Sequence, residues 1–380
     1  MVSTRISSRT GFGPASETMA RDYAQFVHNS GPGFMLPLDT ILGTRYFLIN
    51  SLVGSSRTMS SSSFITDSAA GATAFSCALK TYNGAIGVDP RGAPCGTVLE
   101  AAKEAGYLTG LVATSRITHA TPASFAAHVS TRDMEVFFHL NNDQDAIAEY
   151  EVGNYTLGRR VDLMFGGGRC FFRPNSHNQS CRRDENDMFA WAVNNGWTVG
   201  LEKLSFDALS KNAKLPLLNL FSDDHMAYEI DRDASIEPSL SQMAAKALDI
   251  LSYSTRNAAQ GFFLMIEGSR IDMAGHSNDP ATHLHDILAY QETIAVVKKF
   301  VDDNPSTVMI SVSDHETGGM STGHQLGSAY PEYKWYVVIL AHFAQGNLLR
   351  CKVSNTLAST FFAPSSPSQT HPRSNLYRKQ

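Results

Sequence analysis

The chain has 380 residues, of which 43% are apolar, and a formal net charge of -5 at pH 7. It is long enough to bury a large core, and its apolar content is ordinary for a globular protein. The acidic balance argues against a nucleic-acid-binding protein, which needs a basic surface. The acidic balance does not exclude an anionic substrate, because bound metal ions can outweigh the side-chain charges locally.

The first segment with chemical character surrounds Ser68. This serine follows Asp67 and precedes a run of small residues, Ala-Ala-Gly-Ala-Thr-Ala. The run suits a tightly packed helix whose first amide groups face an anion, although an N-cap role for Asp67 or Ser68 is the commoner meaning of such a pair. A serine hydroxyl needs a neighbouring base or metal to become a nucleophile. Since neither a Gly-x-Ser-x-Gly elbow nor a Ser-His-Asp triad is evident, the sequence favours activation by a metal.

Strands and helices alternate along the rest of the chain. Short apolar runs at 108–114, 261–266 and 307–312 predict strands that are covered on both faces. The patterns at 244–253 and 285–301 predict helices. This alternation predicts an α/β fold with three layers, in which a doubly wound, mostly parallel central sheet carries helices on both faces.

Side chains that can bind metals or transfer protons follow each of the three predicted strands. Because ligands of such sheets bind beyond the carboxyl ends of the strands, we expect these side chains to converge. Their convergence predicts a site for two metal ions. They are His119 and Thr121 after the first strand, Glu267, Asp272 and His276 after the second, and Asp314 and His315 after the third.

Each of these groups also has an ordinary structural interpretation. Asp272 and His276 lie four residues apart, so they share a helix face and can grip one zinc ion, but as an isolated motif a surface pair is commoner. Asp314 and His315 can bind a metal if the backbone turns sharply there, or they can cap a helix. Glu267 ends an apolar strand, where a buried carboxylate needs a cation or hydrogen bonds.

Two further segments could contact a phosphate group. Arg132 could clamp phosphate through its planar guanidinium group, or it could be an ordinary surface arginine. The glycines at 166–168 lack the lysine and the spacing of a phosphate-binding loop, so they predict a turn after a strand.

The features that bear on the cellular compartment disagree. Cys170 and Cys181 could close a short disulfide loop, and glycosylation sequons begin at Asn154 and Asn178. These features indicate a secretory or vacuolar compartment. However, no apolar run reaches the length of a membrane helix and residues 1–9 have no apolar core. We therefore expect neither a membrane span nor a signal peptide in this chain.

Taken together, the motifs resemble the alkaline phosphatase family, most closely its fungal vacuolar members. The resemblance covers most of residues 11–345 in the family's order, and it implies a single domain over 1–362. The tail at 363–380 is rich in Ser and Pro and is expected to be disordered. The segments that carry the resemblance are 11–21, 66–75, 80–89, 118–123, 267–276 and 313–319.

The resemblance implies hydrolysis of phosphate monoesters with two zinc ions and one magnesium ion. Small phosphate monoesters, and phosphorylated peptides as a second class, would be the substrates, and the protein would be a homodimer without nucleic-acid binding. It also implies a role for each candidate residue. Ser68 would be phosphorylated and then regenerated, Arg132 would hold the phosphate, and Asp67 would orient Arg132. The first zinc would be bound by Asp272 and His276, and the second by Asp314 and His315. Magnesium would be bound by Thr121 and Glu267, with His119 beside it.

The sequence departs from the family pattern in two motifs. The family's first strand ends in an Asp that bridges zinc and magnesium, and here Thr10 takes that position. A His-Thr-Gly motif that supplies a third ligand to the first zinc is also missing, since His371 is a poor match. Segments near 43–51 and 136–142 look foreign to the family. We hypothesise an imperfect gene model with retained introns, which sequencing of the transcript would refute if the message encoded these stretches unchanged.

Two other functions remain open on these observations. If the chain is complete as written, the missing ligands predict a catalytically impaired or inactive metal-binding relic. Alternatively, the same architecture could serve another reaction, as in sulfatases, phosphodiesterases and cofactor-independent phosphoglycerate mutases. The Asp67-Ser68-Ala-Ala context and the 118–123 segment favour the phosphomonoesterase.

Overall fold

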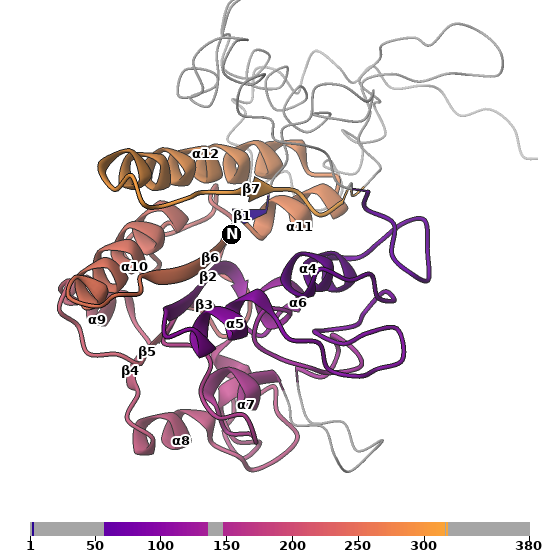
Figure 1. Cartoon of the computed structure of the whole chain (residues 1–380), viewed down its shortest axis with the longest axis horizontal. Helices are drawn as coiled ribbons and strands as arrows, with labels where there is room; N and C mark the ends of the chain where they lie inside the picture. Colours follow the sequence, from indigo (N-terminus) through magenta and orange to yellow (C-terminus); the bar gives the residue numbers. More distant parts are fainter. Residues whose placement is uncertain (1, 4–56, 136–146, 316, 318–380) are drawn as a thin grey trace, which may run out of the picture. The chain divides into compact units, whose positions relative to one another are not determined.

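A parallel sheet forms the centre of the protein, seen in Figure 1. The computed structural model describes residues 2–3, 57–135, 147–315 and 317, all within one compact unit, Met1–Tyr336. The sheet has five strands in the order β4-β5-β3-β2-β6, and every neighbouring pair is parallel. The strands are β2 (Leu108–Arg116), β3 (Leu163–Gly167), β4 (Thr198–Gly200), β5 (Leu217–Leu220) and β6 (Phe262–Glu267).

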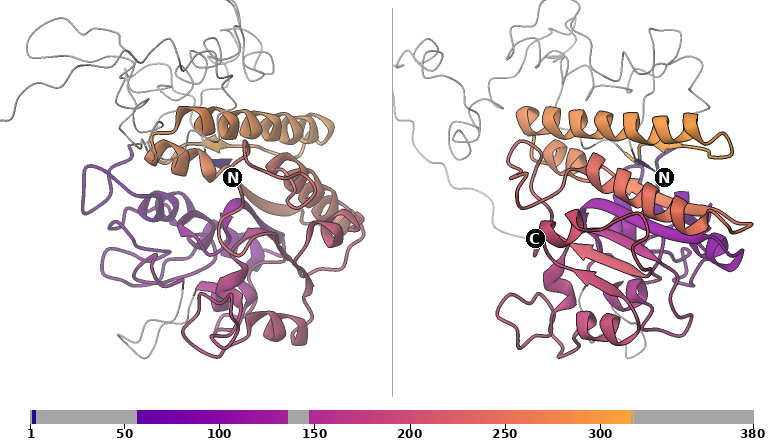
Figure 2. Two further views of the ribbon diagram at one scale, coloured as in Figure 1. Left: turned by 180° about the vertical axis from the view of Figure 1, so that it is seen from behind. Right: turned by 90° about the vertical axis from the view of Figure 1, so that its left-hand side faces the viewer.

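Helices cover both faces of this sheet because its buried strands alternate their side chains between two cores. Leu163 and Phe165 join one core with α10 (Leu240–Thr255) and α12 (Pro280–Asp303), whereas Met164 joins the other. Figure 2 shows α10 and α12 together on their side of the sheet. The predicted doubly wound α/β fold is confirmed. The second core receives side chains from α5 (Val98–Glu104), α7 (Ile147–Val152) and α8 (Met188–Asn194).

Both predicted long helices exist and begin earlier than their apolar patterns suggested. The helix α10 begins after Ser239, which forms a reciprocal capping box with Gln242. The helix α12 begins after Asp279, whose side chain accepts a hydrogen bond from the Thr282 amide, and Pro280 occupies its first turn. These caps use polar residues, so hydrophobic periodicity alone places both starts too late.

The predicted strand at 307–312 is wrong in length and in burial. Within this run only Ser311–Val312 (β7) forms a paired strand, and it pairs in parallel with β1 (Val2–Ser3) in a separate two-stranded sheet. Val308 is 82% exposed and Ile310 is 54% exposed, so this run is not covered on both faces. The cause is local: a turn in which the Thr307 amide donates to Asn304 O follows α12, and among the described strands β1 offers only two residues for pairing.

The sequence predicted a turn at the three glycines 166–168, and the structure shows that only part of this run is a turn. Gly166 and Gly167 are the last residues of β3, and only Gly168, with φ of +99°, leaves the strand. A Cβ atom on Gly167 would lie 2.3 Å from the Asp224 carbonyl oxygen. Glycine is therefore needed there because the loop after β5 packs directly against the strand end.

The described part of the chain contains two disulfides, Cys77–Cys95 and Cys170–Cys181, and each begins at a helical residue and ends outside the helices. The sequence raised the pair Cys170–Cys181 as a possibility, and the structure contains it. It did not raise Cys77–Cys95, whose partners lie 18 residues apart in segments that showed no relation in the sequence. None of the described helices combines the length and apolarity needed to cross a membrane. The segments 43–51 and 136–142, the tail 363–380 and the departures at Thr10 and His371 lie outside the described residues.

Candidate active site

Ser68 is the first residue of α4 (Ser68–Cys77), and it is only 6% exposed. Asp67 caps this helix, since its Oδ1 accepts a hydrogen bond from the Ala70 amide at 3.0 Å. The helix packs closely because a Cβ atom on Gly71 would lie 3.2 Å from Cβ of Asp314. This approach brings Ser68 Oγ to 3.1 Å from Nε2 of His315.

Asp272 and His276 lie on α11 (Arg270–His276), one turn apart as the spacing predicted. Asp272 Oδ1 is 3.3 Å from His276 Nε2 and 3.8 Å from His315 Nε2, and candidate ligand atoms of all three residues lie within 4.8 Å of one another. Asp272 Oδ1 is also shielded from solvent and makes no hydrogen bond to a described residue. Burial raises the pKa of Asp272, and the His315 ring opposes that shift. A nitrogen and carboxylate set of this kind fits a zinc ion.

The contacts of His315 differ from those of a Ser-His-Asp triad. In a triad the serine meets one ring nitrogen and the carboxylate meets the other. Here Ser68 Oγ, Asp314 Oδ2 at 3.4 Å and Asp272 Oδ1 all approach the same Nε2 atom. One hydroxyl and two carboxylate oxygens therefore lie near a single ring nitrogen of His315, and all four are atoms that can bind a cation.

Glu267 ends β6 and is 7% exposed, so its carboxylate lies in the protein interior. Burial raises its pKa to about 7, while hydroxyl groups of Ser269 and Thr121 oppose the shift by donating hydrogen bonds. The Ser269 bond to Glu267 Oε2 is 2.6 Å long. Thr121 comes from α6 (Ala120–Ala123), which follows β2. Glu267 and Thr121 together offer hard oxygen atoms, which suit a magnesium ion.

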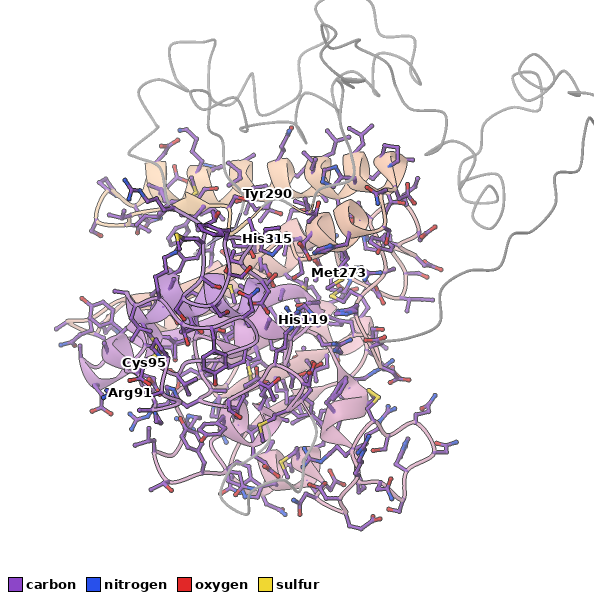
Figure 3. All side chains as sticks on the ribbon, turned by 90° about the vertical axis from the view of Figure 1, so that its right-hand side faces the viewer. Arg91, Cys95, His119, Met273, Tyr290 and His315 are labelled. Atoms are coloured by element: carbon purple, nitrogen blue, oxygen red, sulfur yellow. A yellow bond between two sulfur atoms is a disulfide. The ribbon has the colours of Figure 1, made fainter. Side chains whose placement is uncertain are left out.

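Arg132 is held between two of the other candidate residues. Its Nη1 donates to Asp67 Oδ2 at 3.1 Å, and its Nη2 lies 3.0 Å from Nε2 of His119. Because arginine can only donate, this contact assigns the acceptor role to Nε2 and the proton to Nδ1 of His119. Burial lowers the pKa of His119 well below its usual value, and the charge of Arg132 adds to the effect. The ring is therefore neutral, and Figure 3 labels its position and that of His315.

A cluster of polar side chains next to His119 was not identified from the sequence. Arg116, at the end of β2, forms a two-pronged ion pair with Glu135, and its Nη1 donates to Asp224. The His225 ring meets the His119 ring edge-on, with centroids 5.1 Å apart. Burial lowers the pKa of His225 to about 3, and the charge of Arg116 is the next cause. Asp224 and His225 follow β5, so the strand-end rule would have found them if β5 had been predicted.

Comparisons with known proteins point to one family. Residues 10–359 match the family model described as alkaline phosphatase. The chain is 51% identical over 87% of its length to the alkaline phosphatase of Schizosaccharomyces pombe, and 48% identical over 90% to the repressible alkaline phosphatase of Saccharomyces cerevisiae. The matches span 58% and 60% of those two relatives.

Solved structures give the same result. The alkaline phosphatase of the Antarctic bacterium TAB5 matches with a TM-score of 0.59 and 34% identity, over 73% of both chains. A variant of the TAB5 enzyme with magnesium in its M3 site matches with a TM-score of 0.62 and 28% identity, over 88% of this chain and 83% of that one. With the family match and the two yeast relatives, these results show that the chain belongs to the alkaline phosphatase family.

Proposed function

We propose that the chain hydrolyses phosphate monoesters through attack of Ser68 Oγ on phosphorus, which forms a phosphoserine and releases an alcohol. Water then cleaves the phosphoserine, which releases phosphate and restores the hydroxyl group. The observation that carries this proposal is the convergence of Ser68 Oγ with the donor atoms of Asp272, His276 and His315. The family relatives support the same reaction class.

The proposed cofactors are two zinc ions and one magnesium ion. Asp272 and His276 would hold the first zinc, Asp314 and His315 the second, and Glu267 and Thr121 the magnesium. When bound, such cations stabilise the anionic nucleophile and the charge on the phosphate oxygens. Support for magnesium comes from the TAB5 structure with that ion in its M3 site and from the hard oxygen donors beside Glu267.

The protein's own side chains bind and orient the substrate. Arg132 would grip two phosphate oxygens with its planar guanidinium group. Asp67 and His119 hold that group through its two terminal nitrogen atoms. The position of Ser68 in the first turn of α4 also lets helix amide groups face the incoming anion.

Because these contacts grip phosphate and not the alcohol, the proposed substrates are small phosphate monoesters and phosphorylated peptides. The formal charge of -5 favours partners other than nucleic acids. A homodimer is part of this proposal. A vacuolar or secretory location is also part of it, and the two disulfides support an oxidising compartment.

A single set of assays tests the proposal. The purified chain should contain zinc and magnesium, and it should hydrolyse a chromogenic phosphate ester at alkaline pH. Ser68→Ala should reduce hydrolysis to the background rate, because the nucleophile is lost. Ser61→Ala is the matched control, since Ser61 is exposed and close in sequence. Unchanged activity in Ser68→Ala rejects the nucleophile, whereas bound metal without any turnover favours the inactive relic.

A further inference from the structure

Ser269 occupies the N-cap position of α11 but does not cap this helix. Its backbone has helical angles, φ -63° and ψ -32°, and its side chain makes no cap hydrogen bond in the described structure. A serine in this position ordinarily accepts a hydrogen bond from an amide two or three residues later. Ser269 is 4% exposed, so its hydroxyl group must find partners within the protein.

The hydroxyl group of Ser269 instead connects the ends of two neighbouring strands. It accepts a hydrogen bond from the Ser115 amide at 3.1 Å and donates one to Glu267 Oε2 at 2.6 Å. Since the amide can only donate, the hydroxyl proton of Ser269 remains available for the ionised Glu267 carboxylate. The backbone pairing of β2 with β6 ends at Ala113 and Glu267, so Ser269 continues the connection beyond the last paired residues.

This connection determines where the Glu267 carboxylate lies. Glu267 Oε2 is bound to a hydroxyl group that is itself anchored on the backbone of β2. A hydrogen bond from a hydroxyl group to an ionised carboxylate is among the shorter and stronger kinds. Thr121 donates to the same carboxylate from α6. The lone pairs that Ser269 and Thr121 leave free are those available to a cation.

We propose that Ser269 is a positioning residue that holds the Glu267 carboxylate for magnesium, through its paired contacts with Ser115 and Glu267. The inference rests on the proposed function, because that function assigns magnesium to Glu267 and Thr121. Side chains that orient a metal ligand typically change metal affinity about 10–100-fold when they are removed. Ser269 should therefore affect magnesium binding more than it affects the fold.

The test is a magnesium titration of the metal-free protein, with magnesium as the only added metal. The melting temperature is followed in thermal unfolding, and the magnesium concentration at half of the total shift is compared between variants. For Ser269→Ala this midpoint should rise at least about 10-fold. Ser269→Thr keeps the hydroxyl group and should stay near wild type. If Ser269→Ala does not fold, the same magnesium midpoint is measured for Ser269→Gly, which also lacks the hydroxyl group.

Ser239→Ala is the matched control, because Ser239 is also a buried serine but caps α10. It should lower the starting melting temperature without changing the magnesium midpoint. Equal midpoints for wild type and Ser269→Ala would overturn the inference while leaving the proposed function intact. A wild-type protein that shows no magnesium shift would overturn both the magnesium site of the proposed function and this inference.

Discussion

Asp67 combines two roles that looked like alternatives in the sequence. Its Oδ1 caps α4 through the Ala70 amide, and its Oδ2 accepts hydrogen bonds from Arg132 and from the Gly84 amide. One carboxylate can do both because its two oxygens face different partners. The cap places Ser68 at the helix start, and the other oxygen places the guanidinium group beside it. An N-cap interpretation therefore does not exclude a functional one.

Asp67→Asn separates these roles. Its amide oxygen can still cap α4, but its NH2 group would face the donors of Arg132 and Gly84. Since hydrogen bonds to charged groups are worth about 1.5–3 kcal/mol, we expect kcat/KM for a phosphate ester to fall about 10- to 100-fold. The fall should be accompanied by weaker inhibition by inorganic phosphate.

Asp187→Asn provides the comparison, because Asp187 only caps α8 through the Ala190 amide. It should leave kcat/KM unchanged, since this helix start lies outside the candidate site. If Asp67→Asn kept wild-type kcat/KM and phosphate inhibition, Arg132 would not depend on Asp67 for its position.

At the scale of the element, α12 shows which features a sequence pattern predicts. Leu284, Ile287 and Ile294 follow helical spacing and pack in the core beside α10, as the apolar pattern indicated. Asp286 interrupts this pattern, yet it is 93% buried and its Oδ2 has no hydrogen-bond partner in the described structure. Burial raises its pKa to about 8, although the charge of Arg270 opposes the shift. The burial of a carboxylate inside an apolar face depends on tertiary contacts that periodicity does not contain.

The raised pKa of Asp286 predicts a pH dependence of stability. The unfolded aspartate loses its proton near its ordinary pKa of 3.8, whereas the folded one holds it to about pH 8. The contribution of protonated Asp286 to the free energy of unfolding is therefore fully present below the unfolded pKa. This contribution is lost as the pH rises through the folded pKa. Asp286→Asn should remove this part of the pH dependence, because it cannot ionise.

Urea unfolding at about pH 5 and about pH 9 measures the effect. Between these conditions, wild type should lose at least about 1.4 kcal/mol more than Asp286→Asn, the equivalent of one pKa unit. Asp249→Asn, at an exposed position on α10, should behave as wild type. An identical loss in wild type and Asp286→Asn would show that Asp286 does not keep its proton in the folded protein.

At the scale of the whole molecule, one topological rule predicted that several polar residues of the candidate site would lie close together. Polar residues that follow the ends of parallel strands met as expected around Ser68, His315 and Asp272. The family resemblance supplied their proposed roles. The rule depends on knowing where the strands are. The strand predicted at 307–312 is shorter than expected, and β5 was not predicted, so His225 after β5 was missed. The rule also does not detect Ser269, because the local pattern of that residue is an ordinary helix cap.

The central claim is that Ser68 is the nucleophile at a point where metal-binding side chains converge. The most direct measurement is to quench the protein with acid during hydrolysis of a phosphate ester, digest it, and locate bound phosphate by mass spectrometry. The account predicts one phosphoryl group on the peptide that contains Ser68, and none when chelator has removed the metals. Turnover with Ser68 unmodified, or with the phosphoryl group on another residue, would contradict it.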